Sequence, residues 1–252
     1  MNRQAQAAVL FLLGAALLHA GTTDLYLRYV KAGLQPLLLA SGAVLIAAAL
    51  ATAWYERRGT RTEAPEQESH GEAGHDAEQA AHPHREPRVS WLLVLPLFAL
   101  ILVAPPALGS YSATRTGTAL QPPLAYPALP SADPLRLGVV DYAGRAVYDH
   151  GRTLAGRRIQ LTGFVALDHD GTPYLVRMAL SCCAADAQPV KIGLTGQIPP
   201  VLQPDTWLRV TGTYTAKQTK DPVNNGPIPF IEVTRAEPVA TPRDPYDETW
   251  NN

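Results

Sequence analysis

Residues 157–180 read RRIQLTGFVALDHDGTPYLVRMAL, and this stretch decides the fold of the C-terminal half. Within residues 157–167 the apolar Ile159 and Leu161 alternate with polar residues, as in a half-buried β-strand, and Phe164 and Val165 follow. The polar DHDG at 168–171 is typical of a hairpin turn, and residues 173–180 supply the second strand. Gly163 interrupts the first strand, where a glycine indicates a bulge or bend. The stretch therefore predicts a β-hairpin with a bent first strand.

Three more strand-like segments follow, at residues 189–194, 206–215 (TWLRVTGTYT) and 229–236 (PFIEVTRA). Five short strands with glycine bends predict a small closed β-barrel of the OB type, and a small open β-sandwich is the alternative. Residues 135–150 predict a short amphipathic helix before the barrel, ended by Gly151. We expect an all-β domain over residues 135–240 and a tail over residues 241–252.

The only two cysteines of the chain, Cys182 and Cys183, are adjacent and directly follow the hairpin. A trans peptide holds neighbouring Cα atoms about 3.8 Å apart. Disulfides have Cα separations of roughly 4.4–6.8 Å, so a bridge between these two residues would be strained and easily reduced. Three interpretations stay open: the thiols pack in the core, bind a soft metal ion such as zinc, or carry out redox chemistry.

A metal ion at this pair would need further ligands. Asp186 is the nearest candidate, and His150 and His169 are more distant ones. A carboxylate three residues after Cys183 also suits the cap of a turn or short helix, and a histidine in a DHDG turn is usually an ordinary turn residue. The sequence therefore gives Cys182, Cys183 and Asp186 as a hypothetical metal site.

The N-terminal part contains long apolar segments. Residues 7–27 and 34–55, within a region 1–55, are each long enough to cross about 30 Å of hydrocarbon as a helix. A signal peptide is the alternative for the first, but Leu18 stands where cleavage requires a small residue. Residues 90–108 (SWLLVLPLFALILVAPPAL) predict a third transmembrane helix. His19, in the first helix, marks a partner or pathway, or extends to the interface from the outer end.

Residues 56–89 form a polar linker with almost no large apolar side chains, which predicts disorder. Its histidines offer weak cytoplasmic metal binding among many carboxylates, although a solvated low-complexity linker explains them as well: His70, His75, His82 and His84. Arginines at both ends of the linker place it and the N-terminus in the cytoplasm by the positive-inside rule. Everything after Leu108 is then extracytoplasmic, beginning with an extended connector at residues 109–134.

Composition and motifs exclude several classes of function. The chain has 21 Lys and Arg against 22 Asp and Glu, and it lacks a basic stripe with interleaved aromatic residues, so we expect no nucleic-acid partner. It contains no Gly-x-Ser-x-Gly, no phosphate-binding loop and no His-Glu-x-x-His motif. We therefore expect a membrane protein that is not an enzyme.

The arrangement of these segments resembles the YcgQ-like family of bacterial permease accessory subunits. The resemblance is carried by the polar linker before the third apolar segment, the Pro-Pro exit from that segment, and residues 154–165, 181–189, 207–213 and 242–246. Its most specific part is the run Cys-Cys-Ala-Ala-Asp-Ala at 182–187. The resemblance implies a polytopic permease partner and a role in transition-metal handling, with zinc as the metal, and it brings no catalytic residues.

Two hypotheses follow for function. The first is a non-enzymatic accessory subunit of a membrane permease, with three transmembrane helices and an external β-domain that presents Cys182, Cys183 and Asp186. The second is a membrane-anchored thiol redox protein or sensor that uses the vicinal cysteines. A structural interaction module whose cysteines only pack is the third alternative.

Overall fold

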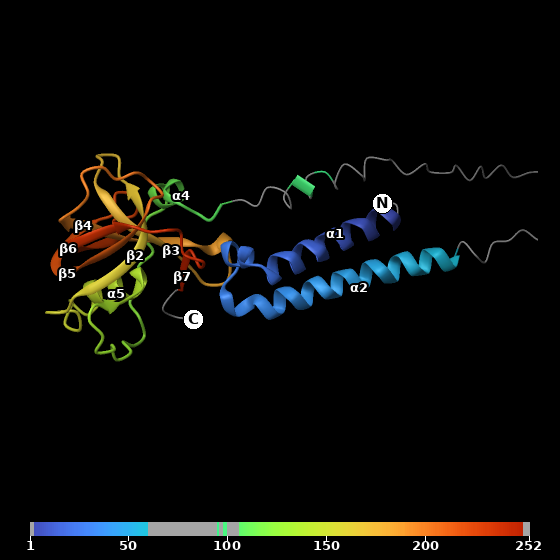
Figure 1. The fold of residues 1–252 in the computed structure, drawn as a ribbon, viewed down its shortest axis with the longest axis horizontal. Coiled ribbons are helices and arrows are strands. Elements are labelled where there is room, and N and C mark those ends of the chain that lie inside the picture. Colours follow the sequence, from blue (N-terminus) through green and yellow to red (C-terminus); the bar gives the residue numbers. More distant parts are fainter. Residues whose placement is uncertain (1–2, 60–94, 96–97, 100–105, 249–252) are drawn as a thin grey trace, which may run out of the picture. The chain divides into compact units, whose positions relative to one another are not determined.

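The structure, a computed structural model, describes residues 3–59, 95, 98–99 and 106–248 (Figure 1). The chain divides into two compact units. One contains Met1–Thr23 and Pro36–Pro105, and the other contains Asp24–Gln35 and Pro106–Asn252. The short segment between the first two helices, which we call the interhelical loop (Asp24–Gln35), therefore belongs to the same unit as the β-domain.

The N-terminal unit consists of helices α1 (Arg3–Thr22) and α2 (Gln35–Gly59), which lie side by side (Figure 1). Among the described residues, these two helices are long and apolar enough to cross a membrane, as the sequence predicts. A Cβ atom on Gly14 would lie 2.8 Å from the carbonyl oxygen of Gly42. The glycines therefore allow the close backbone approach that is common between helices in bilayers.

The boundaries of the apolar segments differ from the sequence-based ones. The first helix ends at Thr22, not near Leu27, because Asp24–Arg28 form a separate 3₁₀ helix, η1, in the C-terminal unit. α2 continues to Gly59, so the first residues of the predicted linker 56–89 are helical. Most of the predicted third span, and the linker histidines His70, His75, His82 and His84, lie outside the described residues.

The C-terminal unit contains a closed β-barrel, which confirms the closed five-stranded barrel predicted from the sequence. Within the described residues its strands are β2 (Ile159–Leu167), β3 (Pro173–Leu180), β4 (Gln188–Gly196), β5 (Trp207–Lys220) and β6 (Pro227–Pro238). They are paired in the order β2-β5-β6-β4-β3, and pairing of β3 with β2 closes the ring. All pairs are antiparallel except β4 with β6, which is parallel.

The first barrel strand bends where it changes partner. Its first half pairs with β5 from Ile159 to Phe164, and its second half pairs with β3 from Phe164 onward. Gly163 lies at this change, and a Cβ atom there would be 2.7 Å from the carbonyl oxygen of Val176. The glycine predicted to mark a bend is thus needed for the close approach of β2 and β3.

We expect the substitution Gly163→Val to lower the free energy of unfolding by about 1–3 kcal/mol, because the new side chain must displace the backbone of β3. Urea unfolding followed by tryptophan fluorescence measures this change. Thr162→Val, at the neighbouring position on the same strand, is the control and should change stability far less. Equal effects of the two substitutions would contradict the close approach at Gly163.

Helix α5 (Val139–Tyr148) precedes the barrel and contacts all five of its strands. It buries Val139, Tyr142, Ala143 and Ala146 in the core, and the Tyr142 hydroxyl donates a 2.7 Å hydrogen bond to the carbonyl of Phe230. The helix is shorter than the predicted 135–150, because residues 135–136 form a short strand, β1 (Leu135–Arg136), parallel to β2.

Two elements outside the barrel correct the predicted connector and tail. The connector predicted as extended at 109–134 begins with helix α4 (Ser110–Arg115), whose first turn is held by Asp205 through bonds of 2.6 and 2.8 Å to the backbone N–H and hydroxyl of Ser110. The predicted tail at 241–252 contains strand β7 (Tyr246–Glu248), parallel to β3. Both are stabilised by residues far away in the sequence.

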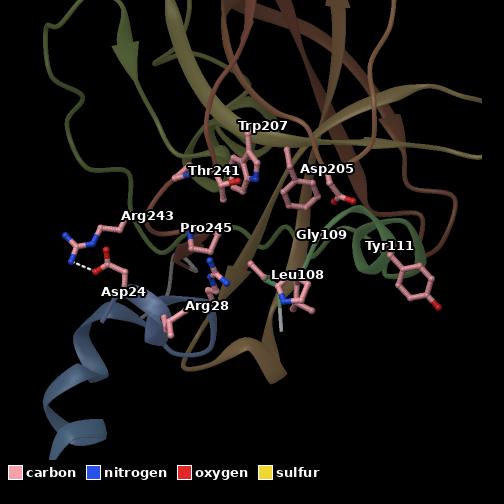
Figure 2. Close-up of a pocket in the computed structure, with 15 residues that line it drawn as sticks. Asp24, Arg28, Leu108, Gly109, Tyr111, Asp205, Trp207, Thr241, Arg243 and Pro245 are labelled. Carbon is pink, nitrogen blue, oxygen red and sulfur yellow. Dashed lines mark ion pairs between the residues drawn. The ribbon is translucent and has the colours of Figure 1, made fainter. Parts of the chain in front are cut away.

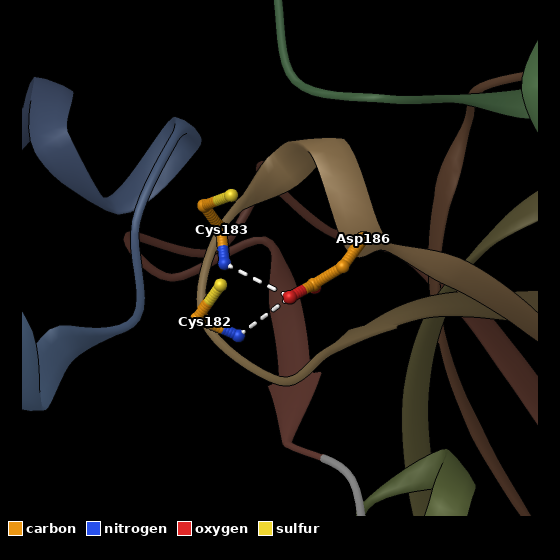
Figure 3. A group of neighbouring side chains, drawn as sticks. All are labelled: Cys182, Cys183 and Asp186. Atoms are coloured by element: carbon orange, nitrogen blue, oxygen red, sulfur yellow. Dashed lines mark hydrogen bonds between the residues drawn. The ribbon is translucent and has the colours of Figure 1, made fainter.

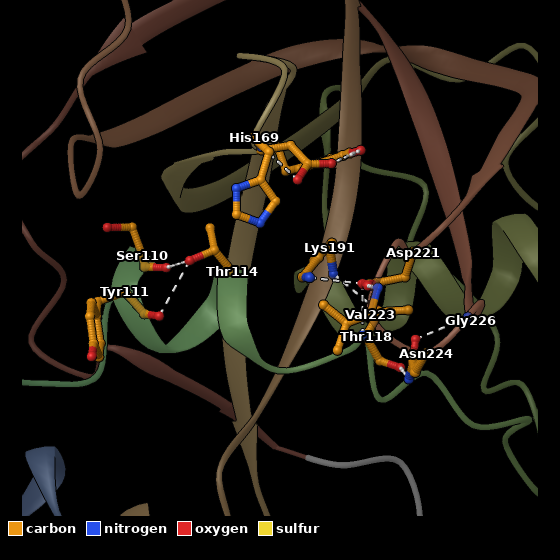
Figure 4. Close-up of polar contacts among 12 residues, drawn as sticks. Ser110, Tyr111, Thr114, Thr118, His169, Lys191, Asp221, Val223, Asn224 and Gly226 are labelled. Carbon is orange, nitrogen blue, oxygen red and sulfur yellow. Dashed lines mark hydrogen bonds and ion pairs between the residues drawn. The ribbon is translucent and has the colours of Figure 1, made fainter.

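A buried ion pair joins β4 to the hairpin between β5 and β6 (Figure 4). Lys191 Nζ lies 2.8 Å from Asp221 Oδ2, and the two side chains are 5% and 0% exposed. The Asp221 carboxylate also accepts hydrogen bonds of 2.9 Å from the backbone N–H groups of Thr118 and Val223. The charge of Asp221 is therefore fully compensated inside the protein.

Candidate functional site

The cysteine loop (Ser181–Ala187) connects β3 to β4 and contains a short 3₁₀ helix, η4 (Ala184–Asp186). The Asp186 carboxylate turns back and accepts hydrogen bonds from the backbone N–H groups of Ser181 and Cys182, both at 2.9 Å, and of Cys183 at 3.5 Å (Figure 3). Asp186 thus caps the loop, which is one of the two roles considered for it from the sequence.

The two thiols lie at the surface on the same loop. Cys182 is exposed, Cys183 is half-buried, and both are free. The ligand atoms of Cys182, Cys183 and Asp186 all lie within 4.8 Å of one another. The structure therefore brings together the three residues named from the sequence.

The more distant candidate ligands belong elsewhere. His150 lies at the end of α5 with a positive φ of 51°, and His169 lies in the turn between β2 and β3. Neither is part of the group formed by the two thiols and the carboxylate. His19 is an exposed residue of α1, where its carbonyl accepts a hydrogen bond from the hydroxyl of Thr23.

Electrostatics in the cysteine loop favour a protonated thiol beside an ionised carboxylate. A hydrogen bond to Asp186, followed by the neighbouring Cys183, raises the pKa of Cys182 to about 11. Desolvation alone would raise the pKa of Asp186, but hydrogen bonds from the Cys182 thiol and the loop backbone outweigh it and hold this pKa below its ordinary value. At neutral pH, Cys182 is therefore a weak nucleophile until a cation displaces its proton.

The interhelical loop pairs directly with the cysteine loop. Val30 forms an isolated antiparallel bridge with Cys183. The backbone N–H of Lys31 donates to the carbonyl of Cys182 at 3.0 Å, and that of Ala184 donates to the carbonyl of Tyr29 at 2.7 Å. Sequence reasoning missed this contact, because neither loop has a periodic pattern that predicts a pairing partner.

The set of donors has the chemistry of an open metal site. Two soft sulfur atoms and one hard carboxylate oxygen form a mixed ligand set of the kind that zinc, a borderline ion, binds. A tetrahedral ion held by these three donors keeps one position for water or for a ligand from another molecule. Sites with an open position exchange their metal or act on substrates, whereas purely structural zinc sites are closed.

A second polar feature was also missed from the sequence. Arg177 of β3 is buried, its Nε donates to Asp247 Oδ1 at 2.9 Å, and its guanidinium lies 5.1 Å from the centre of the Trp207 ring. Asp247 also accepts the N–H of Val139 at the start of α5. The signal was an arginine in the otherwise apolar strand PYLVRMAL, since buried charged residues require a partner.

Comparison with known proteins gives one match. No curated protein and no solved structure matches the chain. The family model of the DUF1980 C-terminal domain matches residues 141–247. The match extends from α5 through the whole barrel to Asp247 in β7, and it includes Cys182, Cys183 and Asp186. Residues 141–247 are therefore similar to the DUF1980 C-terminal domain.

Proposed function

We propose that this protein is a non-enzymatic accessory subunit of a bacterial membrane permease, and that its OB-like β-domain binds zinc through Cys182, Cys183 and Asp186. The observation that carries the proposal is the mutual approach of these three ligand atoms, within 4.8 Å, on a loop whose first thiol is exposed. An open fourth position suits transfer of the ion to or from a partner. The resemblance to the YcgQ-like subunits supplies the permease as that partner.

The pairing between the two loops supports an extracytoplasmic β-domain. When α1 and α2 both cross the membrane, the interhelical loop lies on the side opposite to the N-terminus. The β-domain contacts that loop through Val30 and Lys31, so it must lie on the same side. The third span predicted from the sequence, residues 90–108, would return the chain to that side. The arginines around the linker place this linker in the cytoplasm.

The raised pKa of Cys182 disfavours redox chemistry as the role of the pair. A thiol with a pKa of about 11 is almost entirely protonated near pH 7, which slows attack on a disulfide. A metal ion displaces the proton with its own binding energy. A membrane-anchored thiol redox protein remains the alternative, and it predicts loss of function in Cys182→Ser that added zinc does not rescue.

Zinc binding by the full chain in detergent micelles tests the proposal, with a chromophoric zinc indicator as competitor. We expect Cys182→Ser and Cys183→Ser each to weaken binding at least about tenfold, since changes outside the ligand shell already cost 10–100-fold. Affinity should rise with pH, by about tenfold per unit for each proton displaced, because Cys182 must lose its proton to bind.

Two controls make this result specific. Substitution of the four linker histidines by alanine removes the weak zinc binding expected in the linker. These histidines are His70, His75, His82 and His84. Asp170→Asn changes an exposed carboxylate in the turn between β2 and β3 and should leave affinity unchanged. If the serine variants bind zinc as tightly as the parent in the histidine-free background, the site is wrong. In cells, an unchanged metal content after deletion of the protein would contradict a role in metal handling.

A further inference from the structure

A cavity of about 900 Å³ lies in the C-terminal unit, and neither cysteine lines it (Figure 2). Three chain segments form its walls: η1 (Asp24–Arg28), residues 106–111 and residues 241–245, against Phe164 and Trp207 of the barrel. Its volume is in the range of small-molecule sites, which is about 300–1,000 Å³.

One tyrosine holds these walls together. The Tyr246 hydroxyl donates a 3.0 Å hydrogen bond to the carbonyl of Arg28 and accepts one of 3.2 Å from the backbone N–H of Leu108. Tyr246 itself is 5% exposed. The cavity is therefore bounded by backbone that is fixed through a buried side chain.

Of the charged side chains that line the cavity, one arginine remains that could bind an anionic ligand. Asp24 pairs with Arg243, and Asp205 is used to hold the first turn of α4. Arg28 is exposed, and its guanidinium has no hydrogen bond or ion pair within the described part of the chain. The remaining walls are largely apolar, with Leu25, Leu108, Trp207 and several prolines. One available guanidinium beside an apolar wall suits a ligand with an anionic head and an apolar body.

The position of these residues in the chain indicates the source of such a ligand. Asp24 is the second residue after Thr22, the last residue of α1, and two residues span at most about 7 Å. The described chain resumes at Pro106, within the last three residues of the third apolar segment predicted from the sequence, residues 90–108. Arginine and tryptophan are also side chains that favour the interface between lipid and water.

We propose that the cavity binds the headgroup of an anionic phospholipid, with its phosphate on Arg28 and its glycerol region against Trp207 and Leu108. The inference rests on the proposed function insofar as α1 crosses the membrane, and it assigns to this domain a lipid site distinct from the metal site. Bound lipid would add to the contacts that Tyr246 makes with η1, the first part of the interhelical loop.

Fluorescence of Trp207 tests this directly. The full chain is placed in nanodiscs with Trp207 as the only tryptophan, after phenylalanine replaces Trp54, Trp91 and Trp250. The discs contain either phosphatidylglycerol or phosphatidylcholine brominated on the acyl chain. We expect phosphatidylglycerol to quench Trp207 with about fivefold higher apparent affinity, the preference that one basic residue gives at an anionic surface. Arg28→Gln should abolish this preference.

The control variant is Arg209→Gln, which changes an exposed arginine on the same strand as Trp207 but outside the cavity. It should keep the preference for phosphatidylglycerol. Equal quenching by the two lipids, or an unchanged preference in Arg28→Gln, overturns the proposal. Loss of quenching on addition of inorganic phosphate also overturns it, because the site would then take a soluble anion.

The same preparation separates this inference from the proposed function. The Cys182→Ser variant should lose zinc binding and keep its preference for phosphatidylglycerol. The zinc site and the lipid site are therefore tested independently. A chain that is not retained in the nanodiscs would contradict the membrane part of the proposed function, and with it the lipid site.

Discussion

Replacement of Asp221 by alanine is expected to lower the free energy of unfolding by about 3–5 kcal/mol, the usual cost of removing one partner of a buried ion pair. Lys191, 5% exposed, would then be buried without its counterion. The backbone N–H groups of Thr118 and Val223 would also lose their acceptor. Urea unfolding of the full chain in detergent, followed by tryptophan fluorescence, measures the loss.

Two matched variants define the cause. Asp133→Ala removes an exposed partner of Arg158, whose side chains are 60% and 63% exposed, and should have little effect because water replaces the pair. Lys191→Met combined with Asp221→Ala should be more stable than Asp221→Ala alone, since no unpaired charge is then buried. If Asp221→Ala is no more harmful than Asp133→Ala, the pair does not hold the hairpin to β4.

The substitution Asp186→Asn is expected to raise the reactivity of Cys182 at pH 8 by up to about tenfold. The hydrogen bond to Asp186 is the largest cause of the raised pKa of about 11, against an ordinary value of 9.0. A full return to 9.0 would increase the thiolate fraction at pH 8 by about 100-fold, and the lower basicity of the thiolate reduces the gain in rate to about tenfold.

Alkylation by iodoacetamide in a Cys183→Ala background measures this change as a profile against pH. In this background the rate should keep rising to a higher pH when Asp186 is present than in Asp186→Asn, because the hydrogen bond to Asp186 is the largest cause of the raised pKa of Cys182. Asp170→Asn, in an exposed turn, is the control. An identical profile in the two variants would mean that Asp186 caps the loop without affecting the thiol. The thermal midpoint of Asp186→Asn shows whether the loop keeps its fold.

The barrel was predictable where its signal is local. The hairpin of β2 and β3 follows from alternation and the DHDG turn, and β3 was predicted with the observed bounds, at residues 173–180. β5 was predicted to end at residue 215 but continues to Lys220, where residues 218–220 pair with β6 after an irregularity in the register. Residues 216–220 are all exposed. Strand prediction from alternating apolar and polar residues cannot detect a strand end that is exposed on both faces.

The missed elements depend on partners that are distant in the sequence. α4 is held by Asp205, and β7 is held by its pairing with β3 and by the bond between Asp247 and Arg177. For the candidate site, the vicinal thiols and Asp186 were visible as a motif, because all three lie on one short loop. The contact of this loop with Tyr29, Val30 and Lys31 could not be predicted from the sequence. It joins two irregular loops through backbone N–H and carbonyl groups, which every residue but proline has.

The pairing of the interhelical loop has a consequence for biosynthesis. Val30 and Arg28 leave the ribosome long before Cys183 and Tyr246, their partners in the β-domain. During that interval the hydrogen bonds that Tyr29 and Lys31 form with the cysteine loop cannot exist. The backbone groups of the cysteine loop become available as partners only when the barrel folds, at the end of translation. The order of synthesis therefore makes closure of this contact a late step, and a protease added to nascent chains should cut the loop more readily than in the finished protein.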